Sequence, residues 1–186
     1  MPYIEIIEPE NATGELKDIY DRLKESRGKL AQIHKIQSLN PESITTHMDL
    51  YMSIMFSKSP LSRAQREMMA VVVSSFNNCQ YCRLHHGEAL NHYWKNRKRV
   101  ERLGEDFRKL ELNDIDHSLC RLAQKLTEYP DHIDEEEDIK PLKNTGLSDR
   151  AVLDAVLVIG YFNFVNRIVL GLGVETDEQE IQGYNY

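Results

Sequence analysis

Apolar residues recur every three or four positions through most of this chain, and this spacing constrains the fold more than any other feature of the sequence. The clearest stripes lie within residues 16–23, 44–55, 64–75, 82–93 and 115–126. Strands would instead need apolar and polar residues to alternate, and the sequence shows no clear run of that kind. We therefore predict an all-α fold.

Local signals predict where two neighbouring helices begin and end. Ser62 and Gln65 have the spacing of a capping box, which predicts a helix that starts after Ser62 and ends at the asparagine pair 77–78. The next helix is expected from about residue 79 to residue 94. The basic run that follows, at residues 95–99, is expected to be a solvated helix end.

The most apolar segment, residues 155–165, is shorter than the roughly 20 residues that a membrane span requires. Polar residues also bound or interrupt it, namely Asp154, Asn163, Asn166 and Arg167. We therefore expect a helix that begins after Ser148 and is buried in the core or in a subunit interface, with no membrane association.

Length and composition predict one soluble globular domain over residues 1–186. A chain of 186 residues can bury a core without disulfides or metals. Its apolar fraction of 41% and charged fraction of 28% are ordinary for such a protein. The net charge of −7 argues against nucleic acid as a partner, because binding phosphates requires a basic surface.

The chain has three cysteines, Cys79, Cys82 and Cys120. A sparse and odd number does not describe a secreted disulfide scaffold. The first residues also lack the basic segment and apolar run of a signal peptide, so we expect the reducing cytoplasm. Cys120 adjoins an apolar stripe and is expected to be a packing residue, with a reactive thiol as the alternative.

Cys79 and Cys82 form a Cys-x-x-Cys pair at the expected start of a helix. Such a pair can close a small disulfide loop, and a helix N-terminus stabilises a thiolate. His86 lies four residues after Cys82 on the same helix face, where it can accept the thiol proton or pair with the thiolate. We therefore expect a thiolate paired with His86 to titrate below the ~8.5 of a free cysteine.

Glu67 lies twelve residues before Cys79, on the preceding expected helix. If the two helices form a hairpin, Glu67 reaches the cysteines and can orient His86 or accept a proton through water. The alternative is a surface glutamate one position off the apolar stripe. His85, beside His86, has no role that the sequence assigns.

The same side chains allow other interpretations. Cys79, Cys82, His86 and Glu67 could bind zinc in a non-enzymatic module, although the second cysteine or histidine pair of ordinary zinc sites is missing. The chain could also be an oligomeric redox sensor that retains the site and turns over negligibly. Redox chemistry without a metal ion is the favoured interpretation.

The pattern of Glu67, Cys79, Cys82 and His86 resembles the active-site motif of the alkylhydroperoxidase AhpD-like family, within the carboxymuconolactone decarboxylase-like superfamily. The segments most similar to its branch of uncharacterised peroxidase-related proteins are residues 79–90, 146–150, 161–168 and 170–174. The resemblance covers most of the chain. This branch is longer than a minimal motif-bearing domain, with a C-terminal segment that can cover the site.

The resemblance implies an all-helical fold that forms homo-oligomers, dimers or hexamers, and a thiol peroxidase with no cofactor, neither metal nor haem. It implies that Cys82 attacks a hydroperoxide and becomes a sulfenic acid, and that Cys79 resolves this acid to a disulfide. Glu67 and His86 would form the proton relay. An external dithiol would then reduce the disulfide, which in the best-known relatives is a lipoyl-bearing protein. Relatives that decarboxylate muconolactones typically lack the cysteine pair, which argues against that activity.

Overall fold

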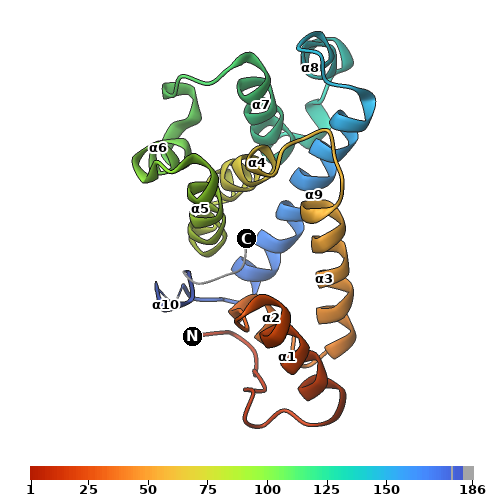
Figure 1. The fold of residues 1–186 in the computed structure, drawn as a ribbon, viewed down its shortest axis with the longest axis vertical. Coiled ribbons are helices and arrows are strands. Elements are labelled where there is room, and N and C mark those ends of the chain that lie inside the picture. The colour runs from red at the N-terminus through yellow and green to blue at the C-terminus, as the bar shows by residue number, and fades with distance from the viewer. Residues whose placement is uncertain (177, 182–186) are drawn as a thin grey trace.

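The computed structural model describes residues 1–176 and 178–181 of the chain. Its α-helices, drawn in Figure 1, are α1 (Gly14–Arg27), α2 (Gln32–Lys35), α3 (Pro41–Phe56), α4 (Arg63–Phe76), α5 (Gln80–Trp94), α6 (Arg97–Asp106), α7 (Asp114–Glu128), α8 (Lys140–Asn144), α9 (Asp149–Gly171) and α10 (Glu178–Ile181). Shorter helical turns lie at Phe107–Lys109, Pro130–His132 and Glu135–Ile139. No strand occurs among the described residues, and the predicted all-α class is confirmed.

Helix α4 lies in the interior, where it packs against α5, α7 and α9 (Figure 1). All its residues from 66 to 74 are buried, as expected for a helix with neighbours on every side. The predicted capping box starts it: the Ser62 hydroxyl accepts from the Gln65 N–H at 3.2 Å, and the Gln65 amide oxygen accepts from the Ser62 N–H at 2.9 Å.

Helix α9 is the long helix expected after Ser148, whose hydroxyl accepts from the Ala151 N–H. By length and composition it could cross a membrane, but half of its most apolar 18-residue stretch is buried inside the protein. Its polar side chains also bond within the protein. Asp154 accepts from Ser59 at 2.6 Å, and Asn166 accepts from Asn77 at 3.0 Å. These contacts are typical of a core helix.

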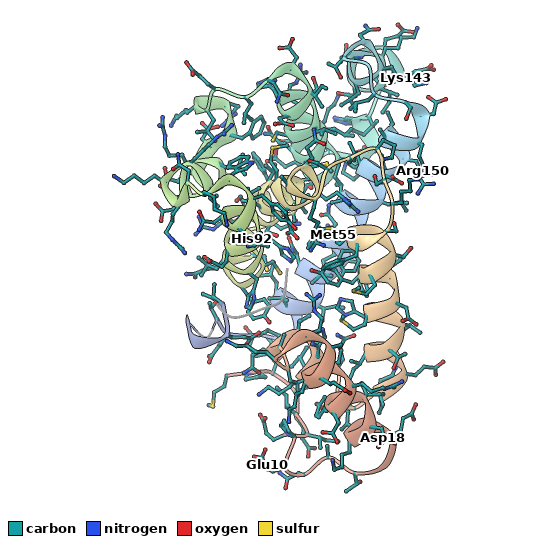
Figure 2. All side chains as sticks on the ribbon, in the orientation of Figure 1. Glu10, Asp18, Met55, His92, Lys143 and Arg150 are labelled. Carbon is teal, nitrogen blue, oxygen red and sulfur yellow. The ribbon has the colours of Figure 1, made fainter. Side chains whose placement is uncertain are left out.

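Helices α1 and α2 form the end of the molecule opposite α8 (Figure 1). With α3 they enclose a second, smaller core made of Ala12, Leu16, Ile19, Tyr20, Leu23 and Ile44. Helix α3 connects this end to the main core, since Met55 near its C-terminus is fully buried there (Figure 2). α3 and α9 pack against each other, and this contact forms one side of the site described below.

The basic run at residues 95–99 is a mostly exposed helix end, as expected, and it also leads directly into α6. Lys95 ends α5 in a left-handed conformation with φ of 51°. Asn96 then accepts from the Arg99 N–H at 3.1 Å and so caps α6. Val100 and Leu103 anchor α6 in the core, while its charged residues face solvent.

Candidate active site

Helices α4 and α5 form the predicted hairpin and bring the four motif residues together. Asn78, at φ 55°, turns the chain, and the Cys79 N–H donates to the Ser74 carbonyl at 2.8 Å. Cys79 is the N-cap residue of α5, and Cys82 lies in its first turn, as expected. Both cysteines are free and buried. The helix N-terminus therefore faces the sulfurs and favours a negative charge there.

Glu67 is fully buried and bonded through both carboxylate oxygens, so the surface position considered for it is wrong. Arg63 donates to one oxygen through Nε at 2.8 Å and Nη2 at 2.7 Å. The other oxygen lies 2.7 Å from His86 Nδ1. Burial alone would raise the pKa of Glu67, but the charges and hydrogen bonds of His86 and then Arg63 outweigh it and hold the pKa below its ordinary value.

An ionised Glu67 determines which nitrogen of His86 can act as a base. A carboxylate only accepts hydrogen bonds, so His86 Nδ1 carries the proton in this contact. Nε2 is then the nitrogen that can accept a further proton, and the resulting imidazolium would be stabilised by the carboxylate. The geometry thus provides an oriented base one helical turn from Cys82, in the lining of a cavity that both residues share.

The two sulfurs of Cys79 and Cys82 lie 2.8 Å apart and share a hydrogen bond. This bond lowers the pKa of Cys79 although burial opposes it. The same bond, with burial, raises the pKa of Cys82 well above its ordinary value. The expectation of a lowered pKa at the cysteine nearest His86 is therefore not met, because the neighbouring sulfur and burial dominate its surroundings.

A cavity of about 100 Å³ adjoins the motif on the side of Cys82. Cys82 and His86 line it, whereas Cys79 does not. A small molecule that enters this cavity therefore contacts Cys82 rather than Cys79. Its lining also includes Arg27 and Tyr161, which sequence reasoning did not select for the site.

The histidines that line the cavity beside His86 are held neutral by burial. Burial lowers the pKa of His34 to about 3, that of His47 to about 4 and that of His85 to about 3. A ligand in the cavity can therefore contact these three histidines through hydrogen bonds and not through a positive charge.

Part of the C-terminal segment also lies beside the site, as the resemblance implies. The Tyr81 hydroxyl donates to Glu180 of α10.

The geometry bears on two alternatives considered for the cysteines: zinc binding by the motif residues and a reactive thiol at Cys120. Among residues 1–176 and 178–181, no three His, Cys, Asp or Glu side chains are grouped so that they could hold a metal ion. Both oxygens of Glu67 are also engaged by Arg63 and His86, which leaves that carboxylate poorly suited to zinc. Cys120 is fully buried, and burial raises the pKa of its thiol, as expected for a packing residue.

The described residues form an all-helical fold in which the α4–α5 hairpin carries a buried Cys-x-x-Cys pair. The family model of the carboxymuconolactone decarboxylase family matches residues 41–100, which run from α3 into α6. An uncharacterized peroxidase-related protein from Silicibacter sp. TM1040 has a similar structure at a TM-score of 0.83 and 29% identity, over 90% of this chain and 87% of that one. In both comparisons the chain is therefore similar to proteins of the carboxymuconolactone decarboxylase family and to peroxidase-related proteins.

Two further solved structures share the fold. An uncharacterized peroxidase-related protein with an AhpD core, from Ralstonia eutropha JMP134, has a TM-score of 0.87 at 18% identity, over 97% of this chain and 94% of that one. The debrominase Bmp8 has a TM-score of 0.78 at 19% identity, over 97% of this chain and 98% of that one. A second structure of Bmp8 holds 2,3,4-tribromopyrrole. None of the curated proteins is similar enough in sequence to count as a match.

Proposed function

We propose that this protein is a thiol-dependent peroxidase that reduces alkyl hydroperoxides with the Cys79 and Cys82 dithiol. The observation that carries the proposal is the buried hydrogen-bonded chain from Arg63 through Glu67 to His86, set beside a cysteine that lines a cavity. A buried carboxylate is costly unless it is paired, and here its pairing orients a base next to a nucleophile. The similarity to the carboxymuconolactone decarboxylase family and to a peroxidase-related protein of known structure supports the same function.

In the proposed reaction, His86 Nε2 accepts the proton of Cys82 and Glu67 stabilises the imidazolium. The Cys82 sulfur then attacks one oxygen of the hydroperoxide, the O–O bond breaks, and an alcohol leaves after protonation. Cys79 attacks the sulfenic acid on Cys82, which forms the disulfide and releases water. The short distance between the two sulfurs supports this second step.

The raised pKa of Cys82 explains why the site would need a base. The hydrogen bond between the sulfurs lowers the pKa of Cys79 and raises that of Cys82, so a negative charge is favoured on Cys79, which does not line the cavity. Transfer of the Cys82 proton to His86 generates the thiolate where the substrate arrives. The reduced pair is thereby kept from reacting until the base acts.

The function is tested by turnover of cumene hydroperoxide and of hydrogen peroxide with a panel of dithiol reductants, including dihydrolipoamide and a lipoyl-bearing protein. We expect multiple turnovers with at least one dithiol and no requirement for added metal. Oxidation of one dithiol per chain without turnover would favour the redox sensor, and stoichiometric zinc in protein purified without chelator would favour the zinc module. Bromide release from 2,3,4-tribromopyrrole would instead favour debromination, a candidate that the aromatic and histidine lining of the cavity supports.

We also propose that the protein works as a cytoplasmic homo-oligomer, a dimer or a hexamer. The apolar side chains that α9 leaves exposed support a subunit interface: Leu153, Val156, Leu157, Phe164 and Leu170. Light scattering over a range of concentrations is expected to give a mass of at least two chains, and Leu157→Glu is expected to lower it. A monomeric wild-type protein would contradict this expectation.

A further inference from the structure

Tyr161 of α9 shares the cavity with Cys82 and His86 but belongs to neither the cysteine pair nor the proton relay. Its side chain is almost fully buried. Its hydroxyl oxygen lies 2.7 Å from Nε2 of His47, a buried histidine of α3. The direction of this hydrogen bond decides whether the Tyr161 proton is available to a substrate.

Gln37 determines the direction. Its amide nitrogen lies 2.7 Å from the carbonyl oxygen of Ile33 and 2.9 Å from His47 Nδ1. A carbonyl oxygen only accepts, so the group that faces Ile33 must be the NH₂ end of the amide. The second N–H of that group then donates to His47 Nδ1, which must accept.

This assignment places the His47 proton on Nε2, because a neutral histidine carries one proton and Nδ1 is the acceptor. His47 is neutral since burial lowers its pKa to about 4. Its Nε2–H therefore donates to the Tyr161 oxygen, and the Tyr161 proton is not used in that contact. Burial also raises the pKa of Tyr161 well above its ordinary value, so the phenol keeps its proton.

We propose that Tyr161 is a catalytic proton donor to the leaving oxygen of the hydroperoxide, and that His47 and Gln37 are positioning residues that hold it in the donor orientation. The proposal rests on the peroxidase function above. The Cys82 sulfur forms a bond to one oxygen, the O–O bond breaks, and the alkoxide takes the Tyr161 proton. Tyr161 then regains the proton that Cys82 gave to His86, so the products are a sulfenic acid and an alcohol.

Tyr161→Phe tests the proposal with two oxidants whose leaving groups differ in basicity. tert-Butyl hydroperoxide releases an alkoxide that needs a proton, whereas peracetic acid releases acetate, which does not. In single-turnover oxidation, with unreacted thiols trapped by iodoacetamide and counted by mass, we expect the rate constant to fall about 100-fold for the hydroperoxide and less than about threefold for the peracid. Tyr20→Phe is the matched control, because Tyr20 is a buried tyrosine whose hydroxyl donates to the Ile7 carbonyl outside the cavity. We expect it to change neither rate.

Gln37→Met tests the positioning role, since methionine has a similar length and no amide. We expect it to slow the hydroperoxide reaction several-fold in the wild-type background and to have no further effect in Tyr161→Phe. Equal losses for both oxidants, no loss for either, or independent effects of the two substitutions would overturn the proposal. A wild-type protein that reacts with neither oxidant would instead overturn the peroxidase function on which the proposal rests.

Discussion

Cys82→Ser is expected to slow oxidation of the protein by cumene hydroperoxide by at least about 10³-fold, because removal of a covalent nucleophile has effects of this size or larger. The expectation follows from the cavity, which Cys82 lines and Cys79 does not. A hydroperoxide bound there meets a hydroxyl in place of a thiol, and an alcohol is a far weaker nucleophile at neutral pH. The measurement is single-turnover consumption of peroxide by the pre-reduced protein.

Two further variants make this result specific to Cys82. In Cys79→Ser we expect one equivalent of peroxide to be consumed and a sulfenic acid to persist on Cys82, where dimedone traps it, because the resolving thiol is missing. Cys120→Ala removes a cysteine from the core and is expected to leave the rate unchanged. The opposite pattern, with rapid oxidation of Cys82→Ser and none of Cys79→Ser, would show that the more readily ionised sulfur of Cys79 meets the peroxide first.

The candidate site could be predicted from the sequence as far as local geometry determines it. A helix that starts at residue 80 places Cys82 in its first turn and His86 one turn further, and the spacing alone gives both positions. Whether Glu67 is buried could not be predicted from spacing in the same way. A single apolar stripe leaves an adjacent position near the surface, whereas α4 is surrounded by other helices and has no exposed side between residues 66 and 74.

Other features depend on contacts between distant segments. His47 and Tyr161 are 114 positions apart, and their hydrogen bond exists because α3 packs against α9. The pKa values of the cysteines depend on a sulfur–sulfur distance that no spacing rule gives. Helix α6 is a different case, since an Asn96 cap and the spacing of Val100 and Leu103 were present in the sequence but lay within a strongly charged segment.

Glu67→Gln is expected to lower the rate of oxidation by cumene hydroperoxide about 10²-fold, a typical effect of impairing a general base. The amide keeps the shape of the side chain but removes the charge that would stabilise a protonated His86. Arg63 also loses its carboxylate partner. Removing one partner of a buried ion pair costs about 3 kcal/mol, so we expect the free energy of unfolding to fall by an amount of that order. Denaturant unfolding measures this loss, and Glu136→Gln on the surface is the control.

The pH dependence separates the charge of Glu67 from its packing. The folded-state pKa of Glu67 lies below its unfolded value of about 4.3, so its ionisation contributes stability that is fully present above the unfolded pKa. This contribution is lost as the pH falls through the folded pKa, where the wild-type carboxyl also becomes neutral. The part of the difference in unfolding free energy between wild type and Glu67→Gln that comes from the carboxylate charge is therefore expected to shrink below about pH 4. A difference that does not change with pH would mean that packing, rather than the carboxylate charge, accounts for the stabilising effect of Glu67 and would remove the physical basis for its role in orienting His86.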